Sequence, residues 1–212
     1  MPPARSALSP ITLNNIRKLS SLENPETKMR LCLTSITLLL LAACGSSPHT
    51  HFYTLTTVPS ATGRRSASIA IQLSAVHVPP LLDRRQMVSM SGPNSVQISE
   101  TNRWSAPLDE MVRNVLAQNL AARLSPNRVI LPQAPAPPGT ASLVVTIAKF
   151  APNASGTVTL QGSWTVLSGD SGASIAHRNF NLTAGPATTA DSAAAAMSEV
   201  LGRLANQIAS AL

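Results

Sequence analysis

A predominantly apolar run of 13 residues near the N-terminus, Leu31 to Ala43, most constrains how this chain can fold. Lys28 and Arg30 flank it with positive charge, and leucine dominates its sequence. A membrane-spanning helix needs about 20 apolar residues, so this run is too short to cross a bilayer core. Its length and its basic flank are typical of the apolar region of a secretory signal peptide. We therefore expect the folded domain to lie after this segment.

The run ends in Leu41-Ala42-Ala43-Cys44, which resembles the bacterial lipobox. In a lipobox, small residues admit the signal peptidase, and the cysteine thiol receives a diacylglycerol before cleavage. We expect Cys44 to carry a covalent diacylglycerol and an N-acyl lipid such as palmitate, and we expect no further cofactor. Two acyl chains anchor a protein stably to a membrane without a spanning helix. The alternative, a buried apolar segment followed by a chance cysteine, leaves the basic flank and the Ala-Ala-Cys ending unexplained.

The same signals divide the chain into four parts. Residues 1–28 hold several prolines and asparagines without apolar periodicity, so we predict that Met29 is the true start and that residues 1–28 are a mis-assigned extension. Residues 29–43 form the lipoprotein signal peptide, and residues 44–50 form a polar tether. Residues 51–212 form one domain. An N-terminal peptide from within residues 1–28 of the native protein would contradict the predicted start.

The composition of the chain argues against a nucleic-acid-binding function. Aromatic residues make up 3% and charged residues 12% of the chain, whose formal net charge is +7. Removal of residues 1–43 leaves 11 basic and 7 acidic residues, and the basic ones are scattered. A nucleic-acid surface combines clustered cations with stacking aromatics, so we expect no nucleic-acid partner. The other cysteine, Cys32, falls within the predicted signal peptide, so the mature domain can form no intramolecular disulfide.

Hydrophobic periodicity predicts two helices among eight strands. The helices are expected over Ser105–Leu124 and Asp191–Leu212, where apolar residues recur at three- and four-residue steps. Alternating or β-branched runs predict the following strands: His51–Val58, Ser68–Val78, a hairpin of Gln86–Ser91 and Ser95–Glu100, Arg128–Leu131, and a meander of Ser142–Phe150, Thr157–Leu167 and Ala173–Thr183. This order predicts an α+β fold, with a mixed or mostly antiparallel sheet and two amphipathic helices packed on one face.

Two motifs could carry catalytic or metal chemistry, and a structural interpretation is favoured for both. Gly169-Asp170-Ser171-Gly172 matches the sequence around a trypsin-like nucleophile, but it falls between two predicted strands and has hairpin-turn composition. His49 and His51 could ligate a metal, but no third ligand follows at suitable spacing. We therefore predict neither a catalytic nor a metal site.

The two tryptophans are the remaining candidates for a specific role. Trp164 lies within a predicted strand, where core packing is expected. Trp104 precedes the first predicted helix and follows Arg103. Its ring could close the core against the start of that helix or face a partner, so Arg103 and Trp104 are candidate partner-binding residues.

Several segments follow the lipobox in a recognisable order. They are Phe52–Leu55 (FYTL), Val78–Val88 (VPPLLDRRQMV), Asn102–Leu120 (NRWSAPLDEMVRNVLAQNL), Leu160–Leu167 (LQGSWTVL) and an alanine-rich C-terminal helix. Taken together, they resemble the ABC-type transport auxiliary lipoprotein family. The resemblance covers residues 44–212, and its most specific parts are the R-W-x-x-P-L entry to the first predicted helix and the L-x-D-R-x-Q-M-V segment at Leu81–Val88.

This resemblance implies a non-enzymatic, periplasm-facing lipoprotein of the outer membrane of a Gram-negative cell. Members of the family work with an MCE-domain protein and, in many systems, an ABC permease and ATPase, and some assemble into rings. They move phospholipids or related lipids between membranes and contribute to envelope integrity. Gly45 follows the predicted lipidated cysteine where inner-membrane retention would typically use aspartate, so outer-membrane sorting is expected.

Two other functions stay open at this point. A structural envelope lipoprotein would need no transporter partner. A tethered periplasmic hydrolase would need a nucleophile with its base, and Ser171 would be the residue to mutate. The ordered set of segments favours the transport function, because composition alone fits all three.

Overall fold

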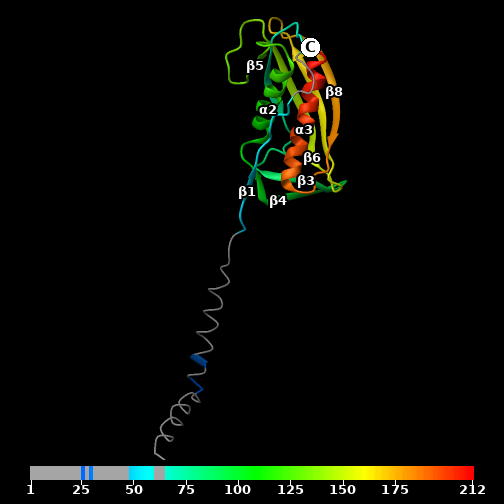
Figure 1. Cartoon of the computed structure of the whole chain (residues 1–212). Helices are drawn as coiled ribbons and strands as arrows, with labels where there is room; N and C mark the ends of the chain where they lie inside the picture. Colours follow the sequence, from blue (N-terminus) through cyan, green and yellow to red (C-terminus); the bar gives the residue numbers. More distant parts are fainter. Residues whose placement is uncertain (1–24, 27–28, 31–47, 60–64) are drawn as a thin grey trace, which may run out of the picture. The chain divides into compact units, whose positions relative to one another are not determined.

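The computed structural model describes residues 25–26, 29–30, 48–59 and 65–212, and it divides the chain into two units (Figure 1). The first unit is Met1–Pro48, in which residues 25–26 and 29–30 are helical. The second unit, His49–Leu212, forms the folded domain of strands and helices. Cys44, most of the signal peptide and most of the predicted extension lie outside the described residues, so those predictions are not tested.

The larger of two sheets has five strands in the order β5-β2-β6-β7-β8. The strands are β2 (Ile71–His77), β5 (Val129–Ile130), β6 (Ala141–Pro152), β7 (Val158–Leu167) and β8 (Ser174–Ala184). β2 runs parallel to both β5 and β6, whereas β6, β7 and β8 form the predicted antiparallel meander. The mixed sheet follows from chain order, because β6 returns beside β2 only after a long connection through a helix.

The smaller sheet has three strands in the order β1-β4-β3, and its presence corrects the prediction of one sheet. It comprises β1 (His51–Tyr53), β3 (Gln86–Gly92) and β4 (Ser95–Trp104). The predicted hairpin is confirmed as β3 and β4. The two sheets separate after β2, because Pro79 and Pro80 cannot donate to a ladder and a turn follows in which Leu82 N donates to Pro79 O over 2.8 Å. The redirected chain then starts β3 away from the first sheet.

Two helices cover one face of the five-stranded sheet, as predicted (Figure 1). They are α2 (Leu108–Arg123) and α3 (Ala190–Ala209), which pack against each other. Thr189 caps α3 in a reciprocal capping box with Ser192. α2 has no such side-chain cap, but Asp109 and Glu110 stand in its first turn, where the positive end of the helix dipole favours them. The α+β fold class is confirmed.

The core lies between the helices and the inner face of this sheet. Inward side chains alternate along β6 and β7, and Trp164 and Phe150 are the largest fully buried ones. The prediction that Trp164 packs in the core is confirmed. The outer face of the sheet is exposed and mostly uncharged, with side chains such as Thr146, Gln161 and Asn179. Alternation with period two thus separates an apolar face from a polar one.

The predicted strand His51–Val58 is shorter than expected, because only its first three residues pair with another strand. Side chains of the two helices hold the remaining residues, 54–58, by hydrogen bonds. Thr56 N donates to Ser198 Oγ of α3 over 3.0 Å, and Val58 N donates to Asn119 Oδ1 of α2 over 2.9 Å. Residues 54–58 are therefore held by hydrogen bonds to buried polar side chains of both helices instead of a strand ladder.

Candidate functional site

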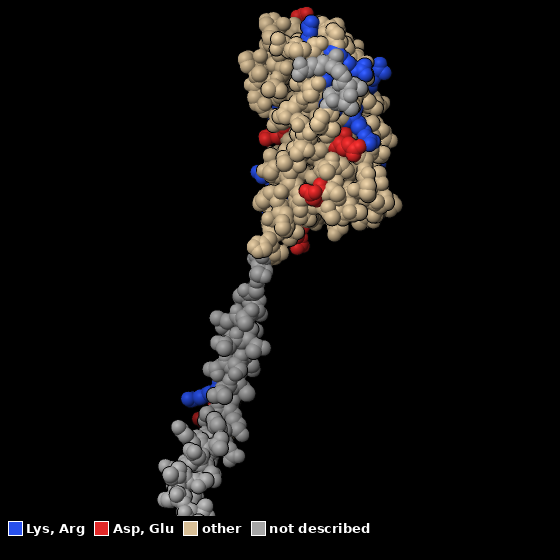
Figure 2. Space-filling view, viewed as in Figure 1, with Lys and Arg blue, Asp and Glu red and all other residues tan. Residues whose placement is uncertain are grey.

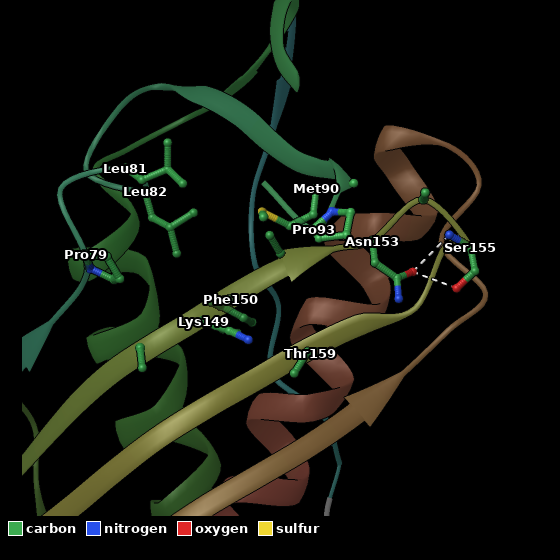
Figure 3. Close-up of a pocket in the computed structure, with 14 residues that line it drawn as sticks. Pro79, Leu81, Leu82, Met90, Pro93, Lys149, Phe150, Asn153, Ser155 and Thr159 are labelled. Atoms are coloured by element: carbon green, nitrogen blue, oxygen red, sulfur yellow. Dashed lines mark hydrogen bonds between the residues drawn. The ribbon is translucent and has the colours of Figure 1, made fainter. Parts of the chain in front are cut away.

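A hollow with a mostly apolar lining lies beside the turn between β3 and β4 (Figure 3). Its walls are formed by the turn at Pro79–Leu82, by the β3–β4 turn at Gly92–Pro93, and by the adjoining ends of β6 and β7, which follow much later in the sequence. Its volume is about 700 Å³, within the range of about 300–1,000 Å³ that is usual for small-molecule sites. We call it the hairpin pocket.

Apolar side chains make up most of the pocket wall (Figure 3). Leu81 and Leu82 approach from the turn after β2, while Met90 and Pro93 approach from the β3–β4 hairpin. Phe150 of β6 is fully buried, so it ties the pocket to the main core. Leu81 is 36% exposed and leaves an apolar surface open to solvent at the rim.

Local sequence explains why these walls are held in place. Asn153 closes the β6–β7 turn, because its Oδ1 accepts hydrogen bonds from Ser155 N, Ser155 Oγ and Thr157 N at 3.0, 2.7 and 2.9 Å. Gly156 in that turn has a φ of +76°, a conformation that favours glycine. The opposite wall is fixed by the Pro79 turn, so the pocket is largely pre-formed.

One charged side chain, Lys149, lines the pocket (Figure 3). It lies at a bulge in β6 next to Ala148, and both residues are exposed. The bulge leaves Lys149 outside while the next residue, Phe150, points into the core. No carboxylate is among the residues that line the pocket. The arrangement can therefore hold an apolar group with an anionic group beside it, and it offers no acid–base pair.

Gly169-Asp170-Ser171-Gly172 forms the turn between β7 and β8, which confirms its structural interpretation. Gly172 N donates to Ser168 O over 2.9 Å, and Ser168 N donates to Ala173 O over 2.8 Å. The Ser171 hydroxyl accepts a bond from Ala173 N over 3.3 Å. His177 is engaged elsewhere, with Nδ1 2.9 Å from Thr165 Oγ1. Within the described residues, Ser171 therefore has no hydrogen-bonded histidine base.

Two further observations concern metals and membranes. Over residues 25–26, 29–30, 48–59 and 65–212, the structure brings together no group of three or more His, Cys, Asp or Glu side chains that could hold a metal ion. In the same ranges, no helix is both long and apolar enough to cross a membrane.

Trp104 and Arg103, the candidate partner-binding residues, lie at the end of β4 beside β1. The Trp104 side chain is only 3% exposed and belongs to the core. Its ring therefore closes the core ahead of α2, the other role that the sequence left open, and a partner cannot contact it without a rearrangement. Arg103 is half-buried, and its Nε has no hydrogen-bond acceptor in the described part of the protein. Partner binding at these two positions stays a prediction.

The sequence alone did not predict the hairpin pocket. Its walls join residues 79–93 to residues 148–159, which meet only after the two sheets have formed. The available signal was Leu81-Leu82 directly after Pro79-Pro80, an apolar pair in a segment that cannot be a strand. A pair of leucines in a loop indicates contact with something apolar, but it does not say with what.

Comparison with known proteins gives this fold a family. Residues 53–209 match the family described as the ABC-type transport auxiliary lipoprotein component. The chain belongs to this family. Its relatives include the intermembrane transport lipoproteins PqiC of Escherichia coli K12 and of Shigella flexneri. Each is 31% identical over 141 residues, which is 64% of this chain and 73% of the relative.

Two solved structures share the fold of this family member. One, of a protein described as uncharacterized, aligns with a TM-score of 0.64 and 23% identity over 77% of this chain and 98% of its own. A protein from Xanthomonas campestris aligns with a TM-score of 0.59 and 14% identity, over 74% and 92% respectively. At these identities the two structures support the architecture, and the family membership rests on the sequence matches.

Proposed function

We propose that this protein is a non-enzymatic outer-membrane lipoprotein subunit of an MCE/ABC-type system that moves lipids between membranes and supports envelope integrity. The observation that carries the proposal is the family match over residues 53–209, together with 31% identity to lipoproteins named for intermembrane transport. An apolar pocket without a neighbouring acid–base pair is consistent with a binding subunit.

The proposed anchor is Cys44, acylated with a diacylglycerol and an N-acyl chain. Seven peptide bonds separate Cys44 from His51, the first residue of β1. A chain of that length reaches at most about 25 Å. The end of the domain where β1 begins therefore stays near the membrane surface, and the opposite end faces the periplasm. Gly45 after the cysteine supports sorting to the outer membrane.

The proposed partner is an MCE-domain protein with its associated permease and ATPase. Figure 2 shows Lys and Arg side chains gathered at the end of the domain opposite β1, near the C-terminal ends of the helices. Such a cluster of cations gives that end of the domain a positive potential. An acidic surface on the partner would be attracted to this end, while Arg103 offers a second contact beside β1.

A homo-oligomeric ring is part of the same proposal. β8 is the terminal strand of the five-stranded sheet and is 11 residues long. The outer face next to it is polar and poor in charge, which suits an interface because charged groups are depleted from interface cores. A long unpaired edge and such a face can join copies of one chain.

The test is chemical crosslinking of the acylated protein in cells, followed by affinity purification and mass spectrometry. Recovery of an MCE-domain protein, with crosslinks that identify the docking face, is the expected result. Recovery of the protein alone, or of cell-wall and porin components, would favour a structural lipoprotein without a transporter. Hydrolysis of an ester or peptide that is lost on Ser171→Ala would instead favour the hydrolase alternative.

A further inference from the structure

We propose that the hairpin pocket binds one acyl chain of a membrane phospholipid, with the phosphate of that lipid beside Lys149. The inference rests on the proposed function, because it takes a lipid to be the cargo. It goes beyond that function by assigning a binding site for the lipid to this chain itself. Four observations support the inference: the apolar lining of the pocket, the hydrogen bonds that already occupy its polar side chains, its one charged side chain, and its position in the fold.

The lining is that of a site for a flexible apolar ligand. Leu81, Leu82 and Met90 provide aliphatic surface on facing walls, with Phe150 beneath them (Figure 3). Apolar surface removed from water contributes about 25 cal/mol per Å². A methylene chain laid between these walls covers the exposed part of Leu81, which the fold leaves in water. Met90 adapts its shape to an irregular ligand because its side chain is unbranched and flexible.

The polar groups of the pocket are poorly suited to a peptide. A bound peptide segment brings N–H and C=O groups that must be paired when they leave water. Asn153 Oδ1, at the mouth of the pocket, already accepts three hydrogen bonds from its own turn, and Ser155 Oγ donates one of them. An acyl chain needs no such partners, so the lining favours a lipid over the main chain of a protein.

The charge of the pocket matches a phospholipid headgroup. Lys149 is exposed at the rim and is the charged residue among those that line the pocket. Within the described domain Lys149 forms no ion pair, whereas Arg203 pairs with Glu199. An ammonium group binds phosphate as a point charge, so it can hold a headgroup without fixing its orientation. Apolar walls with one cation at the rim are complementary to an anionic amphiphile.

The position of the pocket gives it access to a bilayer. Figure 1 shows β3 and β4 at the end of the domain where β1 begins, and the turn between these two strands lines the pocket. The reach of residues 44–50 keeps that end within about 25 Å of the anchor. Phe52 of β1, which is 64% exposed, and Val96 and Ile98 of β4 add exposed apolar side chains to the same small sheet. The pocket therefore opens where the protein meets the lipid surface.

The experiment is photo-crosslinking of the full-length protein in cells grown with ³²P-phosphate. A photoreactive benzoylphenylalanine replaces Leu81 at the pocket rim, and the matched control replaces Leu131, an exposed leucine 49% accessible in the loop after β5. Both sites are exposed, so the probe is expected to leave the fold intact. The lipids on Cys44 contain no phosphorus, so a ³²P-labelled adduct comes from a phospholipid and not from the anchor of the protein itself.

We expect at least fivefold more ³²P-labelled adduct at position 81 than at position 131, with the mass of a glycerophospholipid. Lys149→Glu should lower that yield at least threefold, and Lys149→Arg should keep it. Equal labelling at both positions would overturn the inference. An unlabelled internal adduct to the Cys44 lipid, an adduct to a protein, or one with another phosphorus-containing molecule would also overturn it.

Different results would contradict the lipid site in the hairpin pocket and the proposed transport function. If an MCE-domain protein purifies with the chain but Leu81 gives no phospholipid adduct, the pocket assignment is wrong and the proposed function stands. If a phospholipid adduct forms but no transporter component is recovered, the pocket binds lipid and the transport partner is in doubt.

Discussion

Gly202 of α3 lies directly against Val58, in the segment that follows β1. A Cβ atom on Gly202 would stand 2.9 Å from Val58 Cβ and 3.3 Å from both of its methyl carbons. Real Cβ atoms essentially never come within 3.0 Å of such a neighbour, so the absence of a side chain is what allows the segment to lie against the helix. Glycine at this position serves close packing, although it costs helix propensity.

Gly202→Ala is therefore expected to destabilise the domain. Alanine improves helix propensity by up to about 1 kcal/mol, but forcing a methyl group into a packed site costs about 1–3 kcal/mol. We expect a net loss of about 1 kcal/mol in the free energy of unfolding, measured by urea denaturation. Ala195→Gly, at an exposed site on the same helix, measures the propensity effect alone. A stabilised Gly202→Ala variant would contradict the observed packing.

Asn119→Ala should cost about 2 kcal/mol, because buried groups that lose a hydrogen-bond partner typically cost about 1–3 kcal/mol. Asn119 Oδ1 accepts from Val58 N over 2.9 Å, and Arg123 donates to Val58 O and Asn119 O over 3.2 and 2.9 Å. Burial lowers the pKa of Arg123, and the two carbonyl oxygens pair with its buried N–H groups.

The matched control for that variant is Asn114→Ala on the same helix. Asn114 has only an exposed bond, from Gln133 Nε2 over 3.2 Å, so its loss should lie within about 0.5 kcal/mol. Thermal unfolding of both variants provides the comparison. Equal effects would mean that the buried network around Val58 adds nothing to stability.

Gly162→Ala is expected to be more damaging than Gly202→Ala. An added Cβ would lie 2.1 Å from Thr146 O and 3.0 Å from Ile147 Cα, both on the backbone of the neighbouring strand β6. Backbone cannot move aside cheaply, so we expect a loss of at least about 3 kcal/mol or failure to fold. Gly172→Ala meets no atom within 4 Å but has a φ of +70°, so it should cost only about 1–2 kcal/mol. Soluble yield and melting temperature distinguish Gly162→Ala from Gly172→Ala.

Substitution of Trp104 should lower the stability of the domain, whereas substitution of Arg103 should weaken partner binding. Because the Trp104 side chain is 3% exposed, Trp104→Ala should cost about 3–5 kcal/mol and reduce partner binding only through loss of the fold. Arg103→Ala is the sharper test of partner binding, since this side chain is half-buried at the surface beside β1. We expect Arg103→Ala to keep the melting temperature within a few degrees and to weaken capture of the proposed MCE-domain partner. A Trp104→Ala variant with wild-type stability and normal partner binding would contradict both the core role and the partner-binding role of Trp104.

Cys44→Ala should release the protein from the membrane fraction into the soluble periplasm. The physical reason is that two acyl chains provide the proposed anchor, and the described residues hold no helix able to cross a membrane. Fractionation of cells followed by immunoblotting measures the distribution, with Cys32→Ala as the control because that residue lies within the predicted signal peptide. A variant that stays membrane-bound would show that something other than the Cys44 lipids holds it there.

The sequence alone determined those features that depend on local periodicity. Apolar residues at three- and four-residue steps predicted both helices, and β-branched alternation with Gly-rich turns predicted the meander of β6, β7 and β8. These patterns are reliable because each reports which face of one element is buried. The ordered segments from Phe52 to Leu167 likewise indicated the family without any knowledge of the fold.

Only the tertiary structure decided how distant segments meet. Residues 54–58 look like the continuation of a strand, but they bind the buried side chains of Asn119 and Ser198 instead of a neighbouring strand. The sequence leaves Trp104 either a core role or a partner-facing role, and its burial in the folded domain selects the core role. The hairpin pocket exists because Leu81, Met90 and Phe150 come together from three parts of the chain, and no local pattern encodes that contact. Periodicity specifies that a face is buried, whereas packing selects what buries it.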